Sequence, residues 1–183
     1  MIIFSKGAKG AVFKMELKKK SDFKYRQIYI FLNINFTIMK QFTASNFRGD
    51  CTIDDDFEST AIKINEIAQK YNITVNINSS YRVDANVQGA IVKPATHSNH
   101  MIGHAIDCNL EYQGNLYNST LMQSDTGIVR QFIDELKTNG IRWGGDFGKP
   151  DPVHFDDGLN INDMTAWMTK YNEIHGIEPV NLA

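Results

Sequence analysis

Residues 98–107, with the sequence SNHMIGHAID, restrict the possible functions and folds of this chain more than any other stretch. The chain has five histidines, and two of them lie here, close to Asp107. Gly103 predicts a turn, and the alternation over residues 104–110 predicts a strand that carries apolar side chains on one face and Asp107 on the other. His100 is therefore expected in the loop that enters this strand. The pair His100 and Asp107 alone fits an ordinary buried polar contact as well as two ligands of a metal ion.

His154 supplies a third candidate ligand, because it follows a second glycine-rich irregular segment, GGDFGKPDP. Zinc binds three or four N, O or S ligands, at ~2.0–2.2 Å for histidine and carboxylate. A set of His100, Asp107 and His154 leaves one position for water, which is typical of catalytic zinc sites, since structural sites fill all four positions with protein ligands. The pattern therefore predicts a catalytic centre with Zn²⁺ as its cofactor.

A catalytic centre of this kind also needs a proton acceptor and a group that stabilises negative charge. Asp151 precedes His154 by three residues, an offset that can place its carboxylate beside the metal as the general base and acid. Arg82 is the only arginine between residues 49 and 129, and it lies in a polar loop after a predicted strand. We expect it to stabilise the oxyanion of a tetrahedral intermediate, with an ordinary surface arginine as the alternative.

The remaining histidines and two residues of the glycine-rich segment have less specific interpretations. We interpret His97 as a loop or substrate-side residue, His104 as a strand residue that could support the metal ligands, and His175 as a favourable charge at the end of a helix. Asp146 fits either a substrate contact or a cap of the glycine turn. Trp143 fits the core, and is also a candidate substrate contact.

Hydrophobic periodicity predicts an α+β fold without internal repeats. Three amphipathic helices are expected, over residues 54–71, over 128–136 with Gly140 at the C-cap, and over 164–176. The expected strands are shorter and comprise residues 73–79, 104–110, 141–143 and 153–155. The polar segments 79–99 and 115–120 are expected to be loops or turns, the first with a short helical piece.

Charge divides the chain into two unlike parts. Residues 1–40 hold nine basic and two acidic residues, whereas the whole chain carries a net charge of −2. The sequence thus predicts a basic N-terminal extension, residues 1–40, and a domain that carries the zinc centre, residues 41–183. The extension fits a solvated segment, or one that binds anionic lipid, wall polymer or nucleic acid. Residues 28–39 read equally as a strand or as a weak signal peptide, and they are too short and too polar to span a bilayer.

The cysteine content excludes a zinc finger, because Cys51 and Cys108 are the only two and lie far apart in sequence. They could form one disulfide in an oxidising compartment or stay as two thiols. Cys108 is expected in a buried strand.

Three motifs resemble those of the zinc D-alanyl-D-alanine carboxypeptidase and L-alanyl-D-glutamate endopeptidase family. The resemblance covers about residues 55–172, and the first two motifs fit the family in order and spacing. The first is Ser-x-His-x-x-Gly-x-Ala-x-Asp, beginning at Ser98. The second is Trp-Gly-Gly-Asp from Trp143 to Asp146, followed by Asp-x-x-His-Phe from Asp151. The third is Tyr81 and Arg82 with Gln88 a few residues on. The aspartate at position 156 replaces the glutamate that commonly follows His-Phe, and residues 1–40 match nothing in the family.

The resemblance implies that His100, Asp107 and His154 bind zinc, that Asp151 is the general base and acid, and that Arg82 steadies the scissile carbonyl. It also implies a small antiparallel sheet flanked by helices, shared with the hedgehog signalling domain. The substrate would be the stem peptide of bacterial peptidoglycan, and the remaining motif residues are candidate substrate contacts: Ser98, Gln88, Tyr81, Trp143 and Asp146. Aspartate as the base, together with Trp-Gly-Gly-Asp, favours the endopeptidase branch.

The expected setting is the periplasm or the cell wall, as a monomer without nucleic acid and without stable membrane insertion. A phage endolysin, an interbacterial toxin with an immunity protein as partner, and a wall-remodelling enzyme would all use this domain. A zinc-containing module that binds peptides or the wall without catalysis is the alternative from another functional class.

Overall fold

The computed structural model describes residues 13–14, 29–30, 39–84 and 96–177. The chain divides into two compact units, Met1–Phe36 and Thr37–Ala183. In the first unit, β1 (Phe13–Lys14) pairs with β2 (Tyr29–Ile30) in antiparallel orientation. Residue 40, the last of the expected extension, lies in strand β3 (Met39–Gln41) of the second unit. The roles proposed for residues 1–40 stay predictions.

The second unit is built on a mixed sheet in the strand order β4-β6-β7-β10-β9, with β8 beside β7. All pairings are antiparallel except the parallel pair of β4 and β6. The strands are β4 (Phe47–Arg48), β6 (Thr74–Ser79), β7 (Ala105–Tyr112), β8 (Asn115–Tyr117), β9 (Arg142–Trp143) and β10 (His154–Asp156). A separate two-stranded sheet joins β3 to β5 (Thr52–Asp54).

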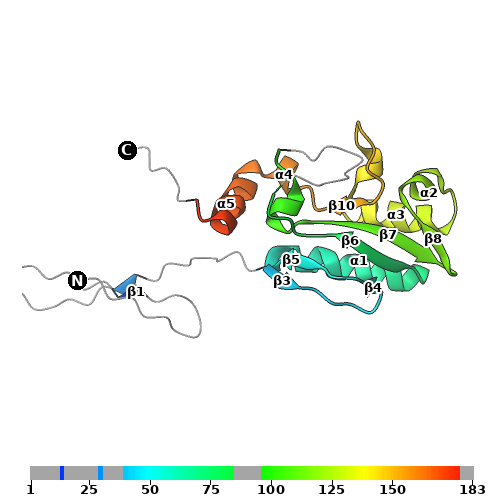
Figure 1. Ribbon diagram of the computed structural model, residues 1–183, viewed down its shortest axis with the longest axis horizontal. Coiled ribbons are helices and arrows are strands. Elements are labelled where there is room, and N and C mark those ends of the chain that lie inside the picture. Colours follow the sequence, from blue (N-terminus) through cyan, green and yellow to red (C-terminus); the bar gives the residue numbers. More distant parts are fainter. Residues whose placement is uncertain (1–12, 15–28, 31–38, 85–95, 178–183) are drawn as a thin grey trace, which may run out of the picture. The chain divides into compact units, whose positions relative to one another are not determined.

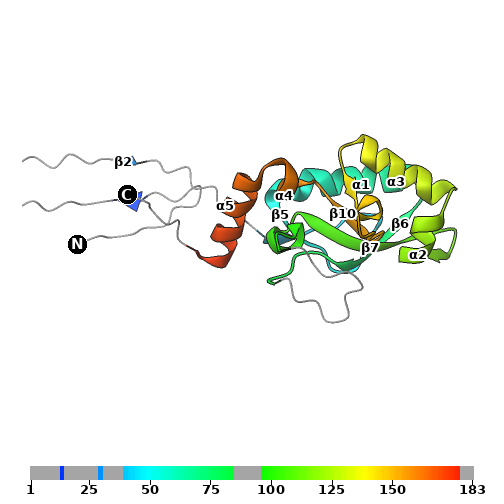
Figure 2. The same ribbon diagram turned by 90° about the horizontal axis from the view of Figure 1, so that it is seen from above.

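Two helices, α1 (Glu58–Tyr71) and α3 (Ile128–Thr138), share one hydrophobic core with the sheet. Figure 2 shows both helices on the same side of β6 and β7. The core side of β7 carries Ile106, Cys108 and Leu110, all buried, whereas Asp107 and Asn109 between them are only partly buried. This confirms the predicted alternation of the strand, and it turns Asp107 away from the helices.

Figure 1 shows the remaining α-helices, α2 (Ser119–Ser124), α4 (Leu159–Asn162) and α5 (Met164–His175), apart from α1 and α3. The described residues also form three short 3-10 helices, η1 (Asp55–Phe57), η2 (Asn99–Ile102) and η3 (Gly144–Asp146). Trp167 of α5 packs with Met101 and Ile102 of η2 in a second, smaller cluster. The helix α5 therefore supports the segment that carries His100.

The expected α+β class and the small sheet flanked by helices are confirmed. The prediction of a loop at residues 115–120 was wrong, because β8 and the start of α2 lie there. The side chain of Asn118 accepts a hydrogen bond from the backbone N of Leu121 and so caps α2, a local signal within a segment of low hydrophobicity. The first predicted helix begins later than expected, since Asp54 ends β5 and caps η1 before α1 starts at Glu58.

Gly103 forms the turn between η2 and β7 in a left-handed conformation, with φ of 71°. A Cβ atom there would lie 2.6 Å from the backbone N of Asp54 and 2.8 Å from the sulfur of Met39. Only glycine fits both the dihedral angle and the space. This residue therefore sets the path from His100 to Asp107.

Candidate metal centre

The three predicted ligands meet at one point of the structure. Asp107 and His154 are direct partners in the antiparallel pairing of β7 with β10, so their side chains stand side by side on one sheet face. His100 reaches the same point from η2. One ligand atom of each residue lies within 4.8 Å of the others.

The contacts between the three side chains form a nearly equilateral triangle. His100 Nε2 lies 2.9 Å from Asp107 Oδ1 and 3.1 Å from His154 Nδ1, and His154 Nδ1 lies 3.0 Å from Asp107 Oδ1. Ligand atoms bound to a tetrahedral zinc at ~2.0–2.2 Å lie ~3.4 Å apart, which is close to these edges. The triangle is thus near the size that a small divalent cation requires.

The outer nitrogen of each imidazole fixes the proton positions. His100 Nδ1 lies 2.6 Å from the carbonyl oxygen of Ser80, and His154 Nε2 lies 2.7 Å from Asp156 Oδ2. Both oxygens only accept, so these two nitrogens carry the protons, and in the neutral rings the inner nitrogens carry lone pairs. Three lone pairs, including that of Asp107, then point at one another. Such an arrangement needs a positive charge at its centre, and the donor set fits a metal ion.

The pKa values of the residues in the triangle point to the same requirement for positive charge. Burial raises the pKa of Asp107, but its hydrogen bonds to His100 and His154 outweigh burial and bring the pKa well below the usual value. Burial lowers the pKa of His154, yet its hydrogen bonds to Asp107 and Asp156 raise that pKa to about 9. Both shifts show that the triangle favours positive charge at its centre.

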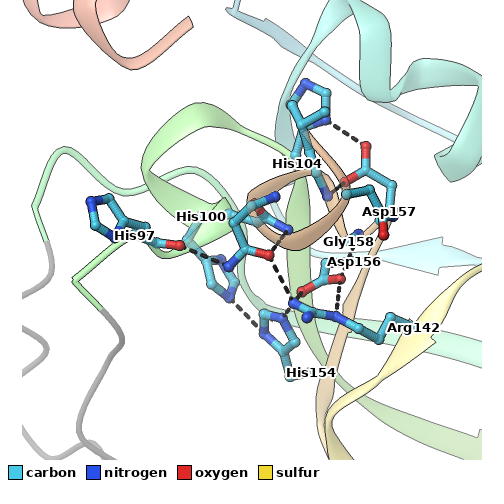
Figure 3. A network of polar contacts seen from close by, with 12 residues as sticks. His97, His100, His104, Arg142, His154, Asp156, Asp157 and Gly158 are labelled. Carbon is cyan, nitrogen blue, oxygen red and sulfur yellow. Dashed lines mark hydrogen bonds and ion pairs between the residues drawn. The ribbon is translucent and has the colours of Figure 1, made fainter. Parts of the chain in front are cut away.

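Asp156 holds His154 in place and is itself held by Arg142 (Figure 3). Arg142 Nε donates to Asp156 Oδ1 at 2.7 Å, and Arg142 Nη2 donates to Asp156 Oδ2 at 2.6 Å, a bidentate pair. Asp156 is 1% exposed, and although burial opposes ionisation, its hydrogen bonds to His154 and Arg142 lower its pKa to about 2. The ionised carboxylate keeps the outer nitrogen of His154 protonated and the inner one free.

The expected base, Asp151, lies on the loop before β10. Its backbone N donates to the Gly144 carbonyl at 2.8 Å, and its carbonyl accepts from the backbone N of His154 at 3.0 Å. Its carboxylate makes no hydrogen bond or ion pair with any residue that the structure describes. Burial, followed by the negative charge of Asp107, raises the pKa of Asp151. A free carboxylate with a raised pKa is suited to accept and return a proton.

Gly144 lets this loop lie against the site. A Cβ atom at residue 144 would lie 2.3 Å from the carbonyl oxygen of Asp151 and 2.8 Å from Cβ of His154. The close approach explains why the glycine-rich segment precedes the ligand. Trp143 also holds the loop, because its Nε1 donates to the Pro152 carbonyl at 2.7 Å.

Arg82 reaches the centre from the loop after β6. Its Nη1 lies 3.8 Å from Asp107 Oδ2, and its backbone N donates to the carbonyl of His100 at 3.0 Å. The guanidinium therefore lies beside Asp107, and the backbone of Arg82 is anchored to that of His100. Its side chain is 22% exposed, so it remains accessible to a substrate.

The candidate substrate contacts lie in different surroundings. Ser98 is buried just before η2, and Tyr81 is half-buried beside Arg82. Trp143 is 1% exposed and belongs to the core, which fits the first of its two interpretations. Asp146 is exposed and pairs with Lys137 at 2.6 Å. Gln88 lies outside the described residues. Contact of these residues with substrate stays a prediction.

His104 belongs to a second buried polar network. Its Nδ1 lies 2.6 Å from Asp157 Oδ2, and its Nε2 lies 3.1 Å from Asp54 Oδ1. Lys170 Nζ donates to the same Asp54 oxygen at 2.7 Å. Burial lowers the pKa of His104, but the hydrogen bonds to Asp157 and Asp54 raise it above the ordinary value. This network fastens α5 to β5 through Lys170.

Sequence reasoning missed Arg142 and also Asn160, whose Oδ1 accepts from Arg142 Nη2 at 3.2 Å, and left the role of Asp156 open. Asp156 follows His154 by two residues in a strand, which places both side chains on one face, and this spacing was the available signal. Arg142 is opposite Asp156 in the pairing of β9 with β10. Asn160 had no comparable signal, because its partners come from two distant segments.

Residues 92–157 match the family model described as D-alanyl-D-alanine carboxypeptidase. The match spans just over a third of the 183 residues and contains all three ligands, Asp151 and Asp156. It confirms the resemblance to this peptidase family that the motifs predicted, over the part of the chain that forms the metal centre. No curated protein matches the chain significantly. Among the described residues, no helix combines the length and the apolar character needed to cross a membrane.

The carboxypeptidase match agrees with the geometry described above. The matched segment runs from before η2 to the end of β10, and so includes the two strands whose pairing aligns Asp107 with His154. Arg82 precedes the matched segment in sequence, and the fold brings its side chain to the metal centre.

Proposed function

We propose that this protein is a zinc peptidase that hydrolyses an amide bond in peptidoglycan stem peptides. The bond is of the L-Ala-D-Glu or the D-Ala-D-Ala type. The observation that carries the proposal is the convergence of three lone pairs, from His100, Asp107 and His154, inside the segment that matches the carboxypeptidase family. Nitrogen and carboxylate ligands of this kind suit zinc.

A bound zinc ion supplies Lewis-acid chemistry, which polarises a carbonyl group and makes a water molecule more acidic. The protein side chains supply the proton transfers. Asp151, whose carboxylate has no partner among the described residues and whose pKa is raised, accepts the proton of the attacking water and then donates it to the leaving amine. Returning the proton is necessary because an amine anion is a poor leaving group.

Arg82 stabilises the charge that develops on the scissile carbonyl oxygen. Its guanidinium is held beside Asp107 by an ion pair at 3.8 Å, which is long enough to be exchanged for a contact with substrate. Because the guanidinium is positioned before substrate binds, little reorganisation is needed in the transition state.

Peptidoglycan as substrate places the activity at the cell wall or in the periplasm. An endolysin and a toxin directed at other bacteria both fit the proposal, and a toxin would have an immunity protein as partner. Mass spectrometry of the products from a defined wall digest identifies the bond and the wall type that is cut.

The test compares purified wild-type protein with two variants on isolated muropeptides. Wild-type protein should release a new fragment and lose this activity to a chelator. Asp151→Asn should retain zinc and lose activity ~10²–10⁴-fold, because only the proton transfer is removed. His154→Ala should lose both zinc and activity. Asp50→Asn, an exposed aspartate elsewhere in the fold, is the matched control and should keep both.

Two results would overturn the proposal. Full activity in Asp151→Asn would exclude the assigned base. Tight zinc binding without cleavage of any stem peptide would instead indicate a zinc-containing binding module.

A further inference from the structure

Asn160 of α4 makes four hydrogen bonds to two segments that are distant in sequence. Its Nδ2 donates to the carbonyl of His97 at 2.8 Å, and its backbone N donates to Asn99 Oδ1 at 3.2 Å. Its Oδ1 accepts from Asn99 Nδ2 at 3.3 Å and from Arg142 Nη2 at 3.2 Å. One side chain thus bridges the start of η2 and strand β9.

The first branch of this network fixes the segment that carries His100. Asn99, directly before that ligand, is 1% exposed and exchanges two hydrogen bonds with Asn160. The carbonyl of Asn99 also accepts from the backbone N of His104 at 2.9 Å. The backbone on both sides of His100 is thereby tied to α4 or to the turn that leads into β7.

The second branch fixes His154 through Arg142 and Asp156. The same nitrogen, Arg142 Nη2, donates both to Asn160 Oδ1 and to Asp156 Oδ2, and that carboxylate oxygen accepts from His154 Nε2. Figure 3 shows Asp156 between Arg142 and His154. The orientation of the His154 ring thus depends on where the guanidinium lies, and Asn160 is one of the groups that fix it.

We propose that Asn160 is a positioning residue of the metal centre, which sets the separation of the two histidine ligands without touching the metal. This inference rests on the proposed function, because it assumes that His100 and His154 bind a metal. The two ligands are 54 residues apart in sequence, so their spacing of 3.1 Å depends on tertiary contacts. Asn160 is hydrogen-bonded to the supports of both, and supporting contacts of metal ligands typically change metal affinity 10–100-fold.

The test measures zinc affinity of the full chain by competition with a chromogenic chelator. Asn160→Ala should bind zinc ~10-fold or more weakly than wild type. Asn162→Ala is the matched control, because Asn162 lies in the same short helix and is exposed. Its side chain donates one long hydrogen bond, 3.4 Å from Nδ2 to the Asp157 carbonyl. Its zinc affinity should equal that of wild type.

A merely structural role would lower the melting temperature without changing the metal site of the folded protein. The absorption spectrum of the cobalt-substituted protein separates the two roles, since it reports ligand geometry. It should change in Asn160→Ala and stay the same in Asn162→Ala. Equal zinc affinities and equal spectra for the two variants would overturn the inference, whereas a wild-type protein that binds no zinc would overturn the proposed function instead.

Arg142→Lys keeps the test decisive if Asn160→Ala does not fold. Lysine retains a positive charge beside Asp156 but cannot contact Asp156 and Asn160 together in the same geometry. The variant should also lose zinc affinity ~10-fold.

Where both single variants fold, the double variant should bind zinc more tightly than the sum of the two effects predicts, because both act through one network. Unchanged affinity in Arg142→Lys, or strictly additive effects, would contradict the proposal.

Discussion

At the residue scale, the proton positions of the two histidine ligands follow from the groups behind them. The Ser80 carbonyl and the Asp156 carboxylate accept from the outer nitrogens, so the inner nitrogens of His100 and His154 are free to bind a cation. The motif alone predicts which residues are ligands. It does not predict the tautomers, because the Ser80 carbonyl belongs to the segment that follows β6, outside the motif.

His104 gives a prediction of how stability depends on pH. The folded protein raises its pKa above 6.5, so His104 stabilises the fold fully below pH 6.5 and loses this contribution as pH rises through the folded value. Two groups facing the imidazole are acidic, Asp54 and Asp157, and Lys170 shares Asp54. His104→Gln should lower the free energy of unfolding by about 2 kcal/mol at pH 6.

The difference between wild type and His104→Gln should shrink as the pH is raised above 6.5. Urea unfolding of the metal-free proteins at several pH values between 5.5 and 9 measures it. A difference that stays constant across this range would show that the imidazole contributes through packing, against Phe57 for example, and not through its charge.

At the element scale, the turn at Gly103 connects the loop ligand to the strand ligand. Gly103→Ala should destabilise the protein by more than 2 kcal/mol, because two costs add up. A left-handed conformation costs alanine about 1–2 kcal/mol, and the new Cβ atom would also collide with the backbone of Asp54. Zinc affinity should fall as well, since the turn positions His100. Denaturant unfolding and chelator competition measure the two effects.

Gly114→Ala separates the two causes. Gly114 also has a positive φ, 75°, but a Cβ atom there meets nothing within 4 Å. This variant should lose only the backbone contribution, about 1–2 kcal/mol, and should keep its zinc affinity. Equal losses of stability in the two variants would show that the close approach at Gly103 is relieved by movement of Met39 and the nearby chain.

The sequence predicts those helices and strands whose apolar residues are regularly spaced. It does not predict elements that depend on local polar contacts or on partners distant in sequence. The stripe on α1 and the alternation of β7 were sufficient to place both. Residues 115–120 were not recognised as β8 and the start of α2, since Leu116 is 53% exposed and Asn118 caps without any apolar periodicity. Lys170 meets Asp54 across 116 residues, and no local pattern encodes such a contact.

At the scale of the whole molecule, metal binding and folding are linked, because the three ligands come from η2, β7 and β10. A ligand that binds only the folded state stabilises it by ~2.7 kcal/mol when present at 100 times its Kd. Zinc should therefore raise the melting temperature of the wild-type protein by roughly 5–10 °C. A chelator should reverse the rise.

His154→Ala is the control for this measurement by thermal unfolding. It removes one ligand of the triangle and should abolish the response to zinc. If zinc raised the melting temperature of this variant as much as that of the wild type, the ion would be binding elsewhere, and the site assigned here would be wrong.

The direct pairing of Asp107 with His154 makes the centre sensitive to insertions and deletions as well as to substitutions. One residue inserted just before His154 would move each following side chain to the opposite sheet face, so that the imidazole no longer stood beside the carboxylate of Asp107. An insertion of equal size at the hairpin Gln113–Gly114 would leave that alignment intact. Functional versions of this domain should therefore differ in length at the hairpin, and should have no insertions or deletions in β7 and β10.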